Sequence, residues 1–163
     1  MRMHYPTTLV GPTKAKGNAQ MQYKTCTHQA KSVLLRKFRT MIKALLIVGT
    51  GSFVGGALRY ALSRYMKHFC GQGFPWGTLA ANLVGCLAFG MVFALFSKHG
   101  TTAHPWCLLL TTGLCGGFTT FSTFAHESIQ MLQGGNIAPF AAYVATSIVV
   151  GLAMVAIGYL IVR

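Results

Sequence analysis

The sequence predicts an all-α membrane protein with four transmembrane helices, the third of them broken. Hydrophobic residues make up 53% of the 163-residue chain and charged residues only 9%, against about 25% in an ordinary soluble domain. Its apolar stretches are long enough to cross a bilayer, which takes about 20 residues. Two adjacent glycines and a run of Thr and Ser interrupt the third stretch, and these residues form helices poorly.

The charges lie where a membrane protein needs them. Lys and Arg total 14 and Asp and Glu total one, which gives a net charge of +13. Eight basic residues precede Met41, and the others lie mostly at the edges of apolar stretches: Lys43, Arg59, Arg64, Lys67, Lys98 and Arg163. This placement is typical of anchors at the lipid headgroups rather than of a surface that follows a nucleic-acid backbone.

Residues 1–40 are basic and polar, without the continuous apolar core of a secretory signal peptide. We expect them to be either a disordered extension or the result of a start codon assigned upstream of the true one. Met41 begins MIKALLIVGTG, a natural opening for a membrane protein. Residues 41–163 are therefore expected to form the transmembrane domain.

The first two spans are expected at about residues 42–65 and 77–96. Both carry small residues about four apart, which let helix backbones approach closely in lipid: Gly51, Gly55, Gly56, then Gly77, Ala81, Gly85. Asn82 is the one strongly polar side chain of the second span. Its amide is suited either to bonding between helices or to donating to an ion.

The third and fourth spans are expected at about residues 105–132 and 137–162, with the break between Gly116 and Ser122. Non-helical backbone at membrane depth persists only where it is buried in protein or lines a wet path. The first half-helix would end in carbonyls that suit a cation. The second would begin with N–H groups that suit an anion.

The side chains around this break are suited to an ion path. Phe118, Phe121 and Phe124 recur every three residues, interleaved with Thr and Ser hydroxyls. An isolated Phe in a membrane helix usually only packs, but the positive edge of a ring can face an anion. Arg59 is expected to be structural or a headgroup anchor that raises the potential for anions at a pore mouth. Glu127, the only acid, is expected in a vestibule.

Three segments resemble the signature stretches of the CrcB/Fluc fluoride channels: GGALRY (55–60), GTLAANLVG (77–85) and GLCGGFTTFSTFAHE (113–127). The glycine-to-TTFSTF run is highly specific, and the resemblance covers nearly all of residues 41–163. It implies a fluoride-specific ion channel that passively exports fluoride and reduces its toxicity. Such a channel is a multi-pass protein of the plasma membrane, the bacterial inner membrane, and is not an enzyme.

The resemblance also implies an antiparallel, dual-topology homodimer with two fluoride pores. One structural sodium ion, not transported, would be held by the backbone carbonyls of Gly116 and Thr119 from each subunit. The fluoride pathway would draw on three spans: Asn82, Phe121, Phe124, Thr120, Ser122, Tyr143 and Ser147. One turn further on is Gly151, where a further hydroxyl would be expected.

Other classes of protein fit less well. A small multidrug-type transporter is also a four-helix, dual-topology dimer, but it needs a carboxylate in its first span, and Glu127 lies in the third. A non-transporting membrane subunit would have no use for a polar, broken span. An enzyme is the least expected class, because no nucleophile–base pair or metal-ligand set is visible.

The basic residues on the two sides of the membrane bear on orientation. Leaving Arg59 aside as intramembrane, and with Arg163 placed on the side of Arg64 and Lys67, residues 41–163 carry two basic residues on one side (Lys43, Lys98) and three on the other. Both orientations are then expected to insert. The eight basic residues of the extension make the count ten against three and favour a cytoplasmic amino terminus.

Overall fold

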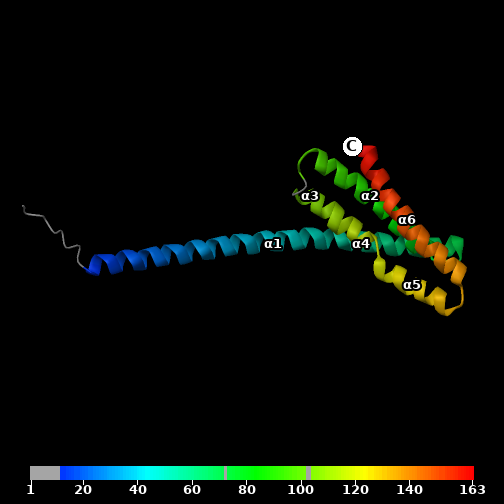
Figure 1. The fold of residues 1–163 in the computed structure, drawn as a ribbon, viewed down its shortest axis with the longest axis horizontal. Helices are drawn as coiled ribbons and strands as arrows, with labels where there is room; N and C mark the ends of the chain where they lie inside the picture. Colours follow the sequence, from blue (N-terminus) through cyan, green and yellow to red (C-terminus); the bar gives the residue numbers. More distant parts are fainter. Residues whose placement is uncertain (1–11, 72, 102–103) are drawn as a thin grey trace, which may run out of the picture. The chain divides into compact units, whose positions relative to one another are not determined.

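The computed structural model describes residues 12–71, 73–101 and 104–163, with side chains from residue 31 onward. The helices, drawn in Figure 1, follow in this order: α1 (Pro12–Cys70), α2 (Trp76–Lys98), α3 (Pro105–Leu108), the π-helical η1 (Leu109–Cys115), α4 (Gly116–Phe118), α5 (Phe121–Gln133) and α6 (Ile137–Val162). The described part of the chain contains no strand. The all-α prediction is confirmed.

Four segments of the described chain are long and apolar enough to cross a membrane: Lys31–Cys70, Trp76–Lys98, Pro105–Gln133 and Ile137–Val162. They match the four predicted spans, with a first helix that begins well before residue 42. The third span is a series of helical segments, α3 to α5, rather than one continuous helix.

The chain divides into two units within α1, Met1–Ile42 and Lys43–Arg163. The second unit holds the helical bundle. The expectation for residues 1–40, an extension or an upstream start, stays a prediction. Residues 1–11 and the side chains of residues 12–30 lie outside the part that the structure describes.

Glycines allow α1 to approach the third span at backbone contact. A Cβ added at Gly51 would lie 2.6 Å from the carbonyl oxygen of Leu109, and one at Gly55 would overlap the carbonyl oxygen of Leu114. Gly56 faces open space instead. A backbone carbonyl cannot move aside as a flexible side chain can, so a larger residue would not fit at either position. The predicted small-residue contact is therefore confirmed for Gly51 and Gly55.

The α2 and α6 helices pack by the same means. A Cβ at Gly90 would overlap the carbonyl oxygen of Val155, and one at Gly158 would overlap that of Leu87. The predicted stripe on α2 is buried throughout: Gly77, Ala81 and Gly85.

The α2 and α6 helices run parallel. Phe74, just before α2, contacts Tyr143 near the start of α6, and Phe93 contacts Tyr159 near its end. The carboxyl terminus lies at the end of the bundle where α2 ends (Figure 1). Placing Arg163 on the side of Arg64 and Lys67 was therefore wrong.

Four crossings return the chain to the side from which it started. For residues 41–163, with intramembrane Arg59 left aside, the corrected balance is three basic residues, Lys43, Lys98 and Arg163, against two, Arg64 and Lys67. The difference is still small, so the argument for mixed orientation of this part of the chain is unchanged.

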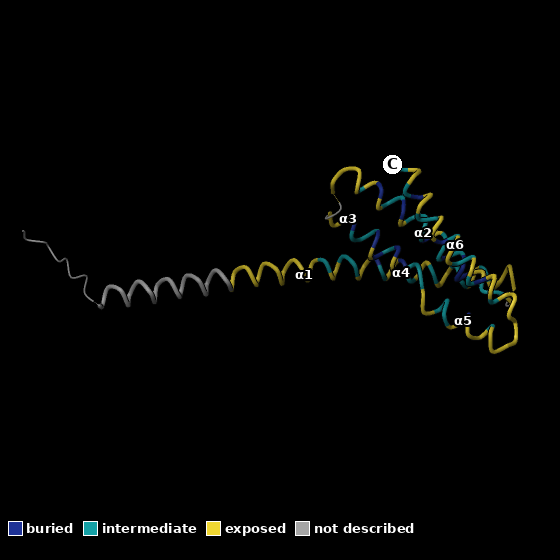
Figure 2. The backbone as a smooth tube through the Cα atoms, in the orientation of Figure 1, coloured by how far each residue is buried: buried dark blue, intermediate teal, exposed yellow. Residues whose placement is uncertain are grey.

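A single chain buries little of its membrane-spanning surface. Only 11% of the most apolar window is buried in the first and in the fourth span. Figure 2 shows buried positions along α2 and α6, which pack against each other. Tyr143 is the largest side chain that is fully buried. The remaining apolar faces must meet lipid or another protein.

Candidate functional site

The third span loses its helical geometry at two threonines. The single turn α4 ends at Phe118, and α5 begins at Phe121. Between them Thr119 (φ −81°, ψ 156°) and Thr120 (φ −150°, ψ 119°) are extended. The break lies inside the predicted interval, between Gly116 and Ser122.

Asn82 on α2 replaces one hydrogen bond that the break removes and adds a second bond to the same residue. Its Oδ1 accepts from the N–H of Thr120 at 2.8 Å, and its Nδ2 donates to the carbonyl of Thr120 at 3.2 Å. In a continuous helix the N–H of Thr120 would donate to the carbonyl of Gly116. The amide nitrogen has a second N–H, so Asn82 can fix the break and still offer a donor to an ion.

Arg59 on α1 also forms a hydrogen bond to the backbone beside the break. Its Nε donates to the carbonyl of Gly117 at 3.4 Å. A cation at this position also suits the partial negative charge at the end of a helical segment. The structural role expected for Arg59 is therefore present in the described contacts.

The two carbonyls expected to bind sodium flank this junction. The carbonyl of Gly116 has lost its helical donor to Asn82. Thr119 is fixed by its own N–H and Oγ1, which both donate to the carbonyl of Cys115 at 2.9 and 3.0 Å. Gly116 is exposed, and a Cβ added there would have only the carbonyl oxygen of Thr111 within 4 Å, at 3.8 Å.

Hydroxyl groups gather at the start of α5. Thr120 caps the helix, with its Oγ1 accepting from the N–H of Thr123 at 3.4 Å. The same oxygen lies 3.4 Å from Oγ of Ser122 and donates to Oγ1 of Thr123 at 3.1 Å. Partial positive charge at a helix amino terminus, next to hydroxyl donors, favours an anion.

The predicted aromatic residues divide into an exposed and a half-buried ring. Phe121 is 79% exposed, and its ring centroid lies 5.7 Å from that of the half-buried Phe124. Phe124 in turn lies 5.1 Å from the ring of Tyr143. The structure thus brings Phe124 and Tyr143 together and leaves Phe121 on the surface of the single chain.

Glu127 joins three helices through both carboxylate oxygens. Oε1 accepts from the hydroxyl of Thr78 on α2 at 2.9 Å, and Oε2 accepts from the hydroxyl of Tyr143 on α6 at 2.9 Å. Sequence reasoning did not single out Thr78. Its signal is the spacing of four residues from Asn82, which places both side chains on one face of α2.

Ser147 lies one turn after Tyr143 on α6. Its Oγ is buried and has no hydrogen-bond partner among the described residues. Gly151, where a further hydroxyl was expected, is buried too, and a Cβ there would lie 3.9 Å from Sγ of Cys86. The expected polar row on α6 therefore ends at Ser147.

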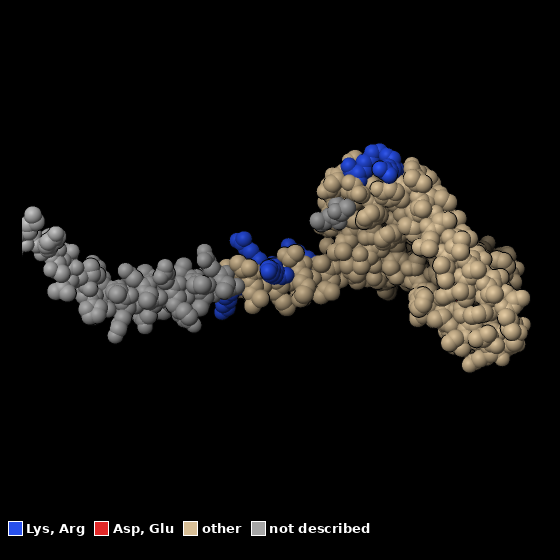
Figure 3. All heavy atoms as spheres, in the orientation of Figure 1, with Lys and Arg blue, Asp and Glu red and all other residues tan. Residues whose placement is uncertain are grey.

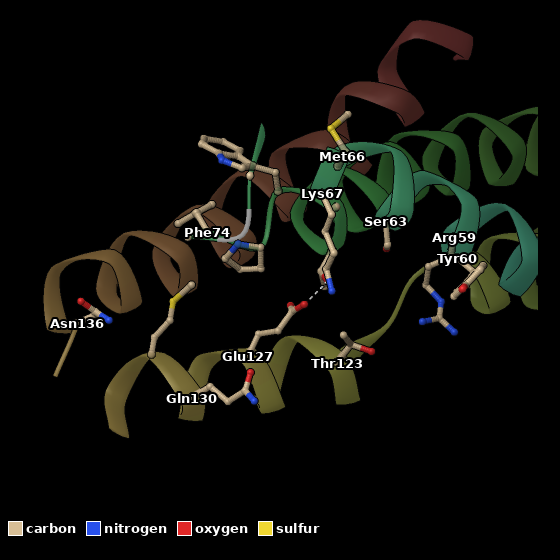
Figure 4. A pocket seen from close by; sticks show the side chains of 17 residues that line it. Arg59, Tyr60, Ser63, Met66, Lys67, Phe74, Thr123, Glu127, Gln130 and Asn136 are labelled. Carbon is tan, nitrogen blue, oxygen red and sulfur yellow. Dashed lines mark hydrogen bonds between the residues drawn. The ribbon is translucent and has the colours of Figure 1, made fainter. Parts of the chain in front are cut away.

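A cavity of about 400 Å³ opens beside the break. Its walls come from α1, α2, α5 and the loop before α2, and include Arg59, Ser63, Lys67, Thr78, Thr123 and Glu127. Figure 4 shows Lys67 and Glu127 extending toward each other across it, with Arg59 further along the same wall. The described residues contain no group of three or more His, Cys, Asp or Glu that could hold a metal ion.

Comparison with known proteins places the chain in a family. The sequence model described as CrcB-like protein, Camphor Resistance (CrcB), matches residues 46–159. A fluoride-specific ion channel FluC of Leptospira interrogans is 41% identical over 110 residues, covering 68% of this chain and 87% of its own. FluC of Chloroflexus aurantiacus is 42% identical over 114 residues, covering 70% and 90%.

FluC of Phocaeicola vulgatus is 41% identical over 117 residues, covering 72% of this chain and 96% of its own. The match covers all four spans and the break. The chain is thus a multi-pass protein of the plasma membrane and belongs to the CrcB-like family.

Proposed function

We propose that the chain forms a fluoride-specific channel that lets fluoride leave the cell passively and so lowers its toxicity. The observation that carries the proposal is the break at Thr119 and Thr120, fixed by Asn82. Fluoride is small and strongly hydrated, so a pore must replace its water with donors. The start of α5, the hydroxyls of Thr120 and Ser122, and the second N–H of Asn82 supply such donors.

The aromatic and buried hydroxyl groups extend this path. Phe121 and Phe124 can turn the positive edges of their rings toward an anion. Tyr143 and Ser147 follow on α6, and the Oγ of Ser147, which has no partner among the described residues, can donate to an anion. Arg59 and Lys67 line the cavity beside the break and raise the local anion concentration there.

A second copy is needed to complete the path. Phe121 is 79% exposed, and Ser122 and Gly116 are exposed as well. Donors on an open face cannot by themselves surround an ion. We therefore propose an antiparallel, dual-topology homodimer, in which this face meets the same face of a second chain.

The dimer would also hold a structural sodium ion. The carbonyls of Gly116 and Thr119 from two chains give four oxygen ligands, and unwound backbone carbonyls are suited to sodium. The carbonyl of Gly116 fits this role because its helical donor bonds Asn82 instead. The ion would belong to the fold and would not be transported.

A multidrug-type mechanism is not favoured. It depends on a carboxylate that exchanges protons for a cationic substrate. Both oxygens of Glu127, the only acid in the chain, accept hydrogen bonds from buried hydroxyl groups. The ion-channel names of the relatives likewise agree with a protein that is not an enzyme.

Halide efflux from liposomes containing the purified full chain tests the function. A fluoride electrode and a chloride electrode should record rapid loss of fluoride and little loss of chloride. Equal efflux of the two halides would contradict the proposal, because a wide or unselective pore does not need the donors at the break.

A further inference from the structure

The beginning of the described part of α1 is amphipathic. Its apolar side chains recur at helical spacing and lie on one face: Leu34, Leu35, Phe38, Met41 and Ile42. Its basic side chains lie mostly on the other face: Arg36, Lys37, Arg39 and Lys43. Lys31 and Val33 depart from this pattern. We call residues 32–43 the basic segment.

The apolar side chains of this segment are exposed among the described residues. Leu34 is 68% exposed, Phe38 58% and Met41 50%. Figure 3 shows Lys and Arg side chains gathered over the same stretch of α1, with no Asp or Glu on that face among the residues drawn as described. Exposed apolar side chains beside basic ones fit a surface in which an apolar phase adjoins negatively charged groups.

The length of the helix places the segment at the membrane surface. Lys31–Cys70 comprises 40 residues, or about 60 Å at 1.5 Å per residue, whereas the hydrocarbon core is about 30 Å thick. The whole stretch cannot lie inside the hydrocarbon. Since Lys43 is the last basic residue before Arg59, the residues before Lys43 fall outside on the amino-terminal side, as those around Arg64 and Lys67 do on the other side.

We propose that the basic segment binds anionic lipid headgroups, with its apolar face sunk into the boundary between headgroups and acyl chains. Basic side chains close to an anionic leaflet each contribute about 1 kcal/mol, which is about fivefold in partition. A helix with one apolar and one basic face binds such surfaces. A nucleic acid would match the charge but would leave the apolar face in water. The inference does not depend on fluoride conduction.

Fluorescence quenching by brominated lipids tests this surface on the full chain. The two natural tryptophans, Trp76 and Trp106, are replaced by Phe. A single reporter is then added as Phe38→Trp on the apolar face or as Thr40→Trp on the opposite face. Vesicles contain equal amounts of phosphatidylglycerol and phosphatidylcholine, and only one of the two lipids carries bromine. Because both leaflets contain the anionic lipid, the result does not depend on orientation.

The Phe38→Trp reporter should be quenched more by brominated phosphatidylglycerol than by brominated phosphatidylcholine, because the basic side chains attract the anionic lipid. The Thr40→Trp reporter should be quenched weakly by both. Adding Arg36→Gln and Arg39→Gln should remove most of the preference, whereas Lys98→Gln with Arg163→Gln, which removes the same charge elsewhere, should leave it.

Equal quenching by the two lipids would overturn the proposal. So would an unquenched Phe38→Trp reporter, which is the result expected if the segment binds a nucleic acid or a soluble protein. Equal quenching of the two reporters would exclude the proposed orientation. A loss of preference that is the same for both pairs of charge variants would show a general effect of net charge and would likewise overturn it.

Discussion

Asn82 bonds the backbone at the break and still has one amide N–H available for an ion. Its Oδ1 accepts from the N–H of Thr120, which would bond Gly116 in a continuous helix, and its Nδ2 adds a bond to the carbonyl of Thr120. The sequence left open whether Asn82 bonds a neighbouring helix or an ion. The structure shows the first, and the remaining amide N–H leaves the second available. Which backbone group Asn82 contacts depends on the register between α2 and the third span. Asn82 and Thr120 are 38 residues apart in the chain, and no local pattern encodes that register.

Replacing Asn82 by Asp should abolish selective efflux. The carboxylate can still accept from the N–H of Thr120, but it loses the donor to the carbonyl and places a negative charge in the anion path. Loss of the hydrogen bond to the carbonyl of Thr120 alone costs about 1–3 kcal/mol. We therefore expect fluoride efflux from liposomes to fall by tenfold or more. Gln133→Glu, which makes the same change at an exposed site, should conduct normally. Full activity of Asn82→Asp would remove Asn82 from the path.

Removing the hydroxyl of Tyr143 should destabilise the bundle. Tyr143 is fully buried, and its hydroxyl donates to Glu127. Tyr143→Phe keeps the ring contacts but leaves a carboxylate oxygen with one donor fewer, at a cost of about 1–3 kcal/mol in the free energy of unfolding. Tyr159→Phe on the same helix removes a hydroxyl that makes no side-chain hydrogen bond to the described residues, and should change the unfolding free energy little. Denaturant unfolding in detergent measures both, and equal effects would contradict the assignment.

At the scale of elements, the sequence predicted the features that depend on residue type alone. Paired glycines followed by threonines predicted the break, and small residues four apart predicted the close helix contacts. The π-helical η1 was not predicted, because its backbone lies against Gly51 and Gly55 of another helix. The bonds from Glu127 to Thr78 and Tyr143 were missed for the same reason. They join three helices across 49 and 16 residues of sequence.

Gly55 and Gly56 are adjacent in sequence and differ sharply in their surroundings. A Cβ at Gly55 would overlap the backbone of Leu114, whereas one at Gly56 would meet nothing within 4 Å. Gly55→Ala should therefore lower the unfolding free energy by about 1–3 kcal/mol, as overpacking does. Gly56→Ala should be neutral or raise it by up to about 1 kcal/mol, since Ala favours the helix. Similar stabilities for the two variants would show that the α1 contact is not as close as described.

At the scale of the whole molecule, the exposed groups are those that a single chain cannot use. Phe121 and Gly116 at the break are exposed, and no helix in the described part of the chain covers them. The resemblance predicted a second copy, and the sequence alone could not show which face that copy would cover. The low burial of the first and fourth spans, 11% of each window, agrees with a chain whose surface meets lipid or a further protein.

The Gly116→Val variant tests the assembly of two chains without changing the fold of one. A Cβ at Gly116 has only the carbonyl oxygen of Thr111 nearby, at 3.8 Å, so the single chain should fold as before. If this face meets a second chain around sodium, the added bulk should dissociate the dimer and abolish fluoride efflux. Size-exclusion chromatography with light scattering measures the mass, and helical content by circular dichroism serves as the control. Thorough removal of sodium from the unaltered chain should lower activity in the same way. An intact, active Gly116→Val dimer would contradict both the interface and the sodium site.

The last prediction concerns orientation, which the charges at the span ends decide. Residues near the membrane count most, within about 15–20 residues of a span. On the amino-terminal side these are Lys24, Lys31, Arg36, Lys37, Arg39, Lys43, Lys98 and Arg163, against Arg64 and Lys67 on the other side. The full chain should therefore insert mainly with its amino terminus in the cytoplasm, and the minority of chains with the opposite orientation sets how many antiparallel dimers form.

Replacing Lys24, Lys31, Arg36, Lys37 and Arg39 with Gln leaves three basic residues against two, and topology tags at the amino terminus should then report both orientations. Replacing Arg2, Lys14 and Lys16, which lie more than 20 residues before residue 42, should leave the orientation biased. An antiparallel dimer needs chains of both orientations, so the five-residue variant should also show more fluoride efflux per chain. If the near and the distant substitutions shift the orientation equally, total charge rather than charge at the membrane governs insertion. If the five-residue variant keeps a single orientation, both the charge argument and the antiparallel assembly fail.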